Sequence, residues 1–235
     1  MITIYTIAYN EEVMLPFMIK WYRERFPECK IVVYDNFSTD KTEEIALSND
    51  CQVVKYDSNN QIRDDLYLEI KNNCWKTAET DWVLICDVDE FLDIQESDLI
   101  NETSTIITSE GWNMINTQPN PNLELKDIKW GTRAKQYDKA YLFNKKFIKE
   151  IRYSAGCHSC NPSGKIKYSS NLYKLFHFKA ISEDYMIQRH TSFAKRMSEQ
   201  NIKNGWGVHY FDTEETIRRN YTFYQTHPEL IKVID

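Results

Sequence analysis

The stretch DWVLICDVDEFL, residues 81–92, joins an apolar run to a cluster of acids. The run from Trp82 to Cys86 is typical of a buried strand, and it leads directly into Asp87, Asp89 and Glu90. Two like charges about 4 Å apart repel by about 4 kcal/mol at an effective dielectric constant of about 20. A positive partner is therefore expected beside these carboxylates.

The residues before this stretch alternate between strand-like and helix-like patterns. Strands are predicted at 2–7, 30–35, 51–56 and 81–86, and helices at 14–26, 39–49 and 62–78. Such a βαβ series predicts an α/β fold whose central sheet is mostly parallel, with right-handed crossovers.

The pattern changes after Asp93. We expect a helix at 96–109, a strand at 111–118, an exposed loop at 119–131, strand-like runs at 139–148 and 165–179, and helices at 182–202 and 212–227. No internal repeat divides the chain, which we interpret as a single domain over residues 1–235.

Three loops follow strands of the predicted parallel sheet: Ala8 to Glu12, Asp35 to Asp40, and Asp87 to Glu90. Open parallel sheets bind ligands at the carboxyl ends of their strands, so the acids stand where a ligand is expected. Asp87 and Asp89 flank one residue, and on an extended segment their side chains point the same way and can share a hard cation. The alternative is a solvated strand end whose acids cap the next helix.

The composition narrows the class of protein. The net charge of −6 argues against a nucleic-acid partner, which needs a basic face. An acidic chain that binds an anion needs local Arg and Lys or a metal ion. No apolar run reaches the length of a membrane span, the N-terminus lacks a secretory signal, and the six cysteines fit reduced thiols. These features predict a cytoplasmic protein.

Four motifs resemble the nucleotide-sugar glycosyltransferases of GT-A fold, specifically the family-2-like group. They are TIAYNEE at 6–12, VVYDNFSTDKT at 32–42, Arg63, and WVLICDVDEFL at 82–92. The second half resembles a branch with a GCHS segment, a later HF and a helix with spaced Arg residues. The resemblance implies a Rossmann-like GT-A fold with C-terminal helices, a nucleotide-sugar-binding half at 1–93 and an acceptor-binding half at 94–235.

The resemblance also implies roles for residues that bind the nucleotide. Tyr9, Asp35 and Asn36 are expected around a uracil ring, where an aromatic face can cover the base and Asp or Asn can accept its N–H. Many relatives carry two acids at positions 35 and 36, so Asn36 leaves open which side chain reads the base. Arg63 is expected to face the nucleotide as a local positive charge, and otherwise to be a surface residue.

A divalent metal ion is implied at the acids. Asp87 is expected to approach the ribose or the metal, and Asp89 to hold Mn²⁺ or Mg²⁺ against the diphosphate. His177 is the first choice for a third ligand and His158 the second, although a single His in an apolar strand is more often a core residue. Cys157 and the cysteine three positions later have zinc-site spacing, but no second pair accompanies them.

The catalytic base is less defined. The acid pair usual in family-2 relatives is missing between Asp93 and His177, which leaves His158, Glu124 and Asp127 as candidates. On the predicted helix at 182–202, Arg189, Phe193 and Arg196 share a face that either contacts phosphate or acceptor or is solvated.

The sequence thus predicts a metal-dependent glycosyltransferase of hexosyltransferase type. It moves a sugar from a nucleotide donor, with UDP favoured, to a hydroxyl of a glycan or related acceptor. A nucleotidyltransferase is disfavoured because AYNEEVML after the first strand lacks a Gly-rich basic loop. A non-catalytic interaction protein on the same scaffold is the other alternative, and intact Asp87, Asp89 and Arg63 argue against it.

Overall fold

Four parallel strands organise the first part of the chain. In the computed structural model, which describes residues 1–118 and 124–234, they are β1 (Ile2–Ala8), β2 (Lys30–Asp35), β3 (Gln52–Lys55) and β4 (Trp82–Ile85). They lie in the order β3-β2-β1-β4, and each neighbouring pair is parallel. The predicted βαβ series is confirmed.

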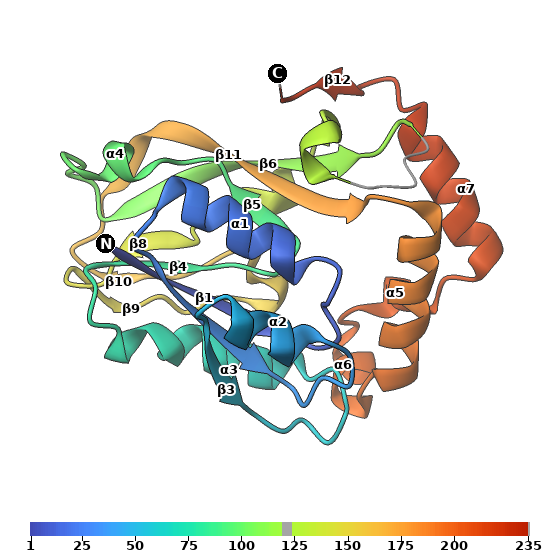
Figure 1. The fold of residues 1–235 in the computed structure, drawn as a ribbon, viewed down its shortest axis with the longest axis horizontal. Coiled ribbons are helices and arrows are strands. Elements are labelled where there is room, and N and C mark those ends of the chain that lie inside the picture. Colours follow the sequence, from blue (N-terminus) through green and yellow to red (C-terminus); the bar gives the residue numbers. More distant parts are fainter. Residues whose placement is uncertain (119–123, 235) are drawn as a thin grey trace.

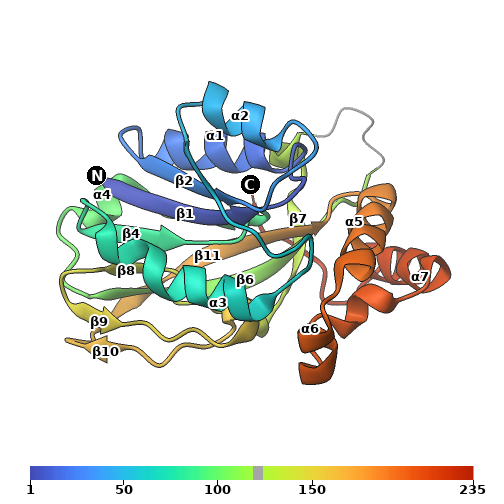
Figure 2. The same ribbon diagram turned by 90° about the horizontal axis from the view of Figure 1, so that it is seen from below.

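The connecting helices cover both faces of these strands. They are α1 (Leu15–Arg25), α2 (Thr42–Ser48) and α3 (Asp64–Asn73), the last extended by the 3-10 turn η1 (Cys74–Thr77). Helices α1 and α2 lie on one face and α3 on the other (Figure 2). Pro16 lies in the first turn of α1, where its missing N–H costs no helical hydrogen bond.

The remaining strands make the sheet mixed. They are β5 (Glu90–Leu92), β6 (Ile106–Ile115), β7 (Trp130–Arg133), β8 (Leu142–Asn144), β11 (Tyr168–Ala180) and β12 (Ile231–Lys232). Strand β8 pairs antiparallel with β4, while β11 runs parallel to β6 and antiparallel to β5. Strands β9 (Ile148–Glu150) and β10 (Ser163–Gly164) form a separate hairpin.

Short helical elements lie between these strands: α4 (Glu96–Leu99) and the 3-10 turns η2 (Leu125–Asp127), η3 (Lys135–Tyr137) and η4 (Ala155–Cys157). The loop predicted at 119–131 lies partly outside the described residues, and its later part forms η2 and the start of β7.

The helix predicted at 96–109 is wrong. Only α4 is helical there, and the chain is extended from Ile106 onward as β6. Four consecutive β-branched residues, Thr105 to Thr108, favour an extended backbone, and pairing with β8 and β11 satisfies that backbone.

The C-terminal helices stand together at the end of the sheet toward which β11 points (Figure 1). They are α5 (Glu183–Arg196), α6 (Glu199–Asn204) and α7 (Glu214–Gln225), with the 3-10 turn η5 (Val208–Phe211) between the last two. The helix predicted at 182–202 is two helices. Met197 is extended, and the Ser198 side chain accepts from Asn201 N–H to cap α6.

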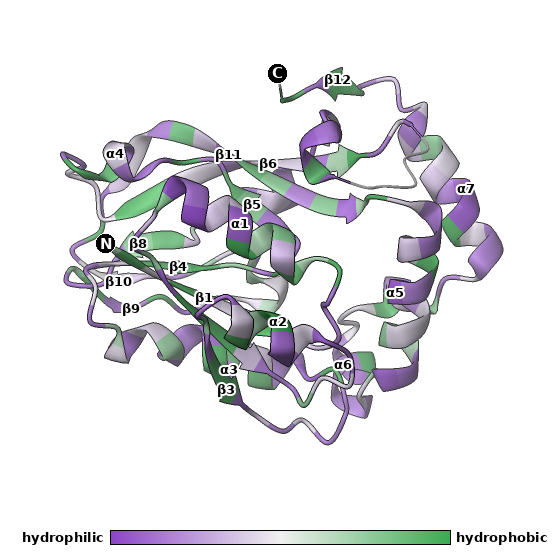
Figure 3. Cartoon of the chain, in the orientation of Figure 1, coloured by the Kyte–Doolittle hydropathy of each residue, from purple (hydrophilic) through white to green (hydrophobic). Residues whose placement is uncertain are grey.

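The apolar residues of the strands form the main core, which appears as the hydrophobic centre of the sheet in Figure 3. This core also fixes the acidic stretch. The buried hydroxyl of Tyr22, on α1, donates to the carbonyl of Glu90 over 3.1 Å and accepts from the N–H of Leu92 over 3.0 Å. Helix α1 therefore holds the backbone of β5 directly behind the carboxylates.

Candidate active site

A cavity of about 670 Å³ lies at the carboxyl ends of β1 and β4 and extends to the C-terminal helices. Five of the ten site residues predicted from the sequence line it: Tyr9, Asp87, Asp89, His158 and His177. Residues about 170 positions apart in the sequence thus line one cavity, at the sheet edge where a ligand was expected.

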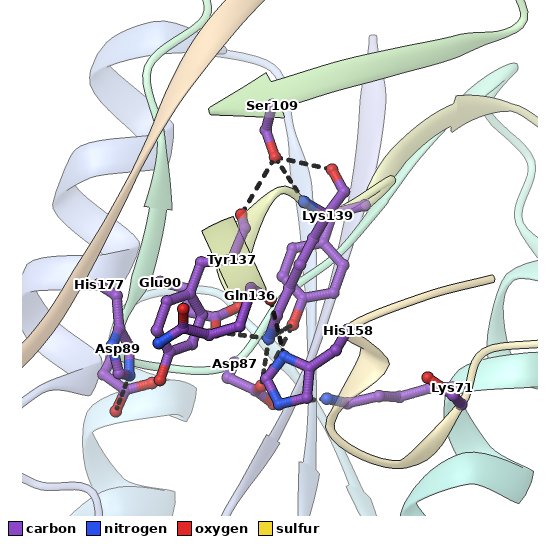
Figure 4. Close-up of polar contacts among 12 residues, drawn as sticks. Lys71, Asp87, Asp89, Glu90, Ser109, Gln136, Tyr137, Lys139, His158 and His177 are labelled. Carbon is purple, nitrogen blue, oxygen red and sulfur yellow. Dashed lines mark hydrogen bonds and ion pairs between the residues drawn. The ribbon is translucent and has the colours of Figure 1, made fainter. Parts of the chain in front are cut away.

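Asp87 is neutralised by lysines of the chain itself. Lys71 Nζ lies 2.5 Å from Asp87 Oδ1, and Tyr141 donates to Oδ2 over 3.2 Å (Figure 4). Partial burial acts to raise the pKa of Asp87, but the charges of Lys71 and Lys139 outweigh it and hold that pKa well below its usual range. Asp87 is therefore ionised, and both of its oxygens already have partners.

Glu90 forms the second pair of this network. The buried Lys139 donates to Glu90 Oε1 and to the Tyr141 hydroxyl, each over 2.6 Å. Burial raises the pKa of Glu90 to about 7, against the opposing charge of Lys139. Its second oxygen, Oε2, has no hydrogen-bond partner among the residues described.

Asp89 is paired from the opposite side of the cavity. Arg189 of α5 places Nη2 3.2 Å from Asp89 Oδ2 and donates through Nη1 to Glu11 over 2.8 Å. Burial acts to raise the pKa of Asp89, yet Arg189 and His177 lower it overall. Burial raises the pKa of Glu11 to about 7. The positive partners predicted for the acids are therefore residues of the chain.

Asp89 and His177 face each other in the cavity. His177 Nδ1 lies 2.9 Å from the Asn113 side-chain oxygen, so Nδ1 carries the proton. Its other nitrogen, Nε2, then presents a lone pair 3.7 Å from Asp89 Oδ2. Burial lowers the pKa of His177 to about 3, against the Asp89 charge, and keeps the imidazole neutral.

Two acceptors that face each other in this way fit a divalent cation between them. Across residues 1–118 and 124–234 no group of three or more His, Cys, Asp or Glu side chains is placed to hold a metal ion. Asp89 and His177 are the protein residues that would hold a Mn²⁺ or Mg²⁺ ion here, and an ion with only two protein ligands would need other oxygen ligands as well. Asp87 is occupied by Lys71 and lies outside this pair.

The residues expected around a nucleobase are only partly available. Tyr9 and Asn36 line a second hollow of about 390 Å³, together with Phe37. The Asn36 amide donates to Ser58 Oγ over 2.6 Å and accepts from the N–H of the same residue. Both of its polar atoms are therefore used within the protein.

Two further nucleotide candidates lie outside both hollows. Asp35 is fully buried and accepts from the Ser38 hydroxyl and from the ammonium of Lys55. Arg63 pairs with its neighbour Asp65 over 2.5 Å. The side chain that does cover Tyr9 is Arg196, whose guanidinium carbon lies 3.1 Å from the ring centre.

His158 is the one predicted base that reaches the cavity. Its Nδ1 donates to the Gln136 carbonyl over 2.8 Å, which leaves Nε2 as an acceptor. Burial lowers its pKa and favours the neutral ring. Glu124 is exposed and pairs with Lys126, and neither Glu124 nor Asp127 lines the cavity.

The charged residues of the cavity that the sequence did not single out include Glu11, Lys71, Lys139 and Lys179. Lys71 could have been suspected because it lies three and four residues before Cys74 and Trp75, on the same predicted helix face as these buried apolar residues, where a lysine needs a partner. Nothing local to Lys139 marks it, since its partner Glu90 is 49 residues away.

Comparison with known proteins agrees with the motifs. Residues 3–97, which hold the parallel strands and the acidic stretch, match the model of glycosyl transferase family 2. The matched segment ends before Lys139, His177 and the C-terminal helices. No curated protein sequence matches the chain significantly.

Several solved structures are similar in overall shape. Staphylococcus aureus TarS residues 1–349 are 14% identical, with 96% of this chain and 73% of that chain covered and a TM-score of 0.45. The same fragment in complex with UDP-GlcNAc is 16% identical over 96% and 74%, also at 0.45. Mycobacterium tuberculosis glucosyl-3-phosphoglycerate synthase with Mn²⁺, UDP and glucosyl-3-phosphoglycerate is 17% identical over 47% and 43%, at 0.34.

No described helix is long and apolar enough to cross a membrane.

Proposed function

We propose that this chain is a metal-dependent glycosyltransferase of hexosyltransferase type. It transfers a sugar from a nucleotide donor, UDP-linked by preference, to a hydroxyl of a glycan or related acceptor. The observation that carries the proposal is the pairing of Asp89 with the neutral His177 in a cavity at the ligand edge of a family 2 segment. The proposed enzyme acts in the cytoplasm, where its six free thiols stay reduced.

In this proposal residues 1–93 bind the donor and residues 94–235 bind the acceptor, within one domain. Asp89 and His177 hold Mn²⁺ or Mg²⁺, which when bound neutralises charge on the departing nucleoside diphosphate. Tyr9 offers a ring for the base, and Arg196 fixes the orientation of that ring. The Lys71 pair keeps Asp87 ionised beside the ribose.

His158 is the proposed general base. A neutral imidazole whose Nδ1 is fixed by a carbonyl presents Nε2 to accept the proton of the acceptor hydroxyl. Tyr137 lies between the two histidines, with ring centres 4.0 Å from His177 and 5.8 Å from His158. The same aromatic ring therefore positions the proposed base and the proposed metal ligand.

The experiment is a calorimetric titration of UDP into the purified protein, with Mn²⁺ and with EDTA. Binding that strengthens by tenfold or more with Mn²⁺ supports the donor site. Failure of UDP to bind in either condition would remove the UDP assignment; if GDP and dTDP also fail, a non-catalytic scaffold replaces the proposal. Formation of a covalent nucleotide product instead of free UDP would favour a nucleotidyltransferase.

A further inference from the structure

Lys179 extends from β11 two residues after His177 and lines the same cavity. Its side chain is half-buried, and its ammonium lies 5.9 Å from the ring centre of Tyr210. The family 2 match ends far before this position, and no sequence motif singled the residue out.

Among the residues described, Lys179 has no counter-ion within 4 Å, a property that it shares with Arg196 but not with the other three cations of the cavity. Lys71, Lys139 and Arg189 each lie within 4 Å of a carboxylate. Within residues 1–118 and 124–234, by contrast, the Lys179 ammonium makes no ion pair and no hydrogen bond, and its one polar contact is with the Tyr210 ring. A half-buried ammonium without a partner is costly, so this position gains stability when an anion enters the cavity.

The neighbours of Lys179 define which anion fits. The carboxylates that act on Lys179 are Asp89, which Arg189 already pairs, and Asp212, and neither lies within ion-pair distance of the ammonium. His177, two residues before Lys179 on β11, faces Asp89, and a divalent ion held by this pair would favour the oxygen atoms of a phosphate. An ammonium is a compact point charge with three donors, which suits phosphate oxygens that lack one fixed orientation.

We infer that Lys179 binds the diphosphate of the donor and stays bound to it as the nucleoside diphosphate departs. This inference rests on the proposed function and adds a phosphate-binding residue to that site. Phosphate oxygens that carry growing negative charge strengthen a charge-assisted hydrogen bond, so the contact is stronger with the leaving group than with the intact donor.

The test is calorimetric binding of uridine, UDP and inorganic pyrophosphate to the full chain in EDTA and in Mn²⁺. In Lys179→Gln we expect affinity for UDP and pyrophosphate to fall about tenfold or more in both conditions, with uridine affinity changed less than about twofold. Lys179→Arg keeps the charge and retains most of the affinity. Lys174→Gln, on the same strand but exposed and outside the cavity, is the matched control. Thermal unfolding verifies that each variant is folded.

Two outcomes overturn the inference while leaving the proposed function intact. One is unchanged UDP and pyrophosphate affinity in Lys179→Gln. The other is loss of pyrophosphate binding with unchanged UDP affinity, which assigns the lysine to an anionic acceptor instead of the donor. If the wild-type protein binds neither UDP nor pyrophosphate, the proposed function and the inference fail together.

Discussion

Arg189 Nη2 lies 3.2 Å from Asp89 Oδ2, so a helix near the end of the chain balances an acid of the stretch that ends the parallel strands. The same guanidinium holds Glu11, in the loop after β1. One residue of α5 therefore joins two of the three loops at the ligand edge of the sheet.

Asp89→Asn is expected to abolish transfer activity and to leave the fold intact. The amide cannot replace an anionic metal ligand, whereas Arg189 keeps its contact with Glu11. Activity is measured as UDP release from UDP-sugars, and folding by thermal denaturation. Asp93→Asn, which changes an acid paired with Arg25 outside the cavity, should retain activity. Undiminished turnover in Asp89→Asn would contradict the assignment of Asp89 as a metal ligand.

His177→Ala is expected to weaken Mn²⁺ affinity by about tenfold or more, because it removes the lone pair that faces Asp89. Electron paramagnetic resonance of free Mn²⁺ in a titration measures this affinity without any turnover. The control is His227→Ala, in a histidine outside the cavity. Equal Mn²⁺ affinity in His177→Ala and wild type would show that His177 is not a metal ligand.

His158→Gln is expected to lower kcat by about 10²-fold or more, the usual contribution of a general base, with UDP affinity nearly unchanged. Glutamine can keep the hydrogen bond to the Gln136 carbonyl but cannot accept the proton. Steady-state rates with an active acceptor and UDP calorimetry separate the two effects. A variant that loses UDP affinity and rate together would assign His158 to binding instead.

Asp64→Asn is expected to raise the free energy of unfolding above that of the wild type, and the difference should grow as the pH rises. Burial raises the pKa of Asp64 from 3.8 to about 6, and its carboxylate accepts from Asn201. As the pH rises, the Asp64 carboxyl therefore loses its proton at a lower pH in the unfolded chain than in the folded protein. The free energy of unfolding of the wild type falls as the pH rises from about 3.8 to about 6. The amide does not ionise and keeps the hydrogen bond.

The advantage of Asp64→Asn over the wild type should therefore grow by about 2 kcal/mol between about pH 4.5 and about pH 8, as urea denaturation can measure. Asp65→Asn is the adjacent control. The hydrogen bond from Arg63 lowers the pKa of Asp65, so its substitution should show no such gain. Equal advantages for Asp64→Asn at both pH values would contradict the raised pKa.

The parallel strands and the position of the acids were predictable because both depend on local patterns. The apolar runs of β1, β2 and β4 mark buried strands, and the carboxyl ends of parallel strands meet at one edge. The helix predicted at 96–109 failed because β-branched residues after Ser104 form a strand once β8 and β11 lie beside them.

The electrostatics of the site were only half predictable. Crowding of Asp87, Asp89 and Glu90 called for positive charge, and the structure supplies it through Lys71, Lys139 and Arg189. These partners lie on α3, in the segment before β8 and on α5, and only the tertiary fold brings them to the acids. The Asp89–His177 pair was expected from family resemblance, whereas the use of Asn36 by Ser58 depends on a loop contact.

The Tyr22 hydroxyl that bridges Glu90 and Leu92 implies an order of assembly. All the residues that make this contact precede residue 93, whereas the strand that pairs with β5 is β11. Neutralisation of Glu90 and Asp89 requires Lys139 and Arg189, which are translated much later. A nascent chain therefore contains the crowded carboxylates before it contains the cations that neutralise them.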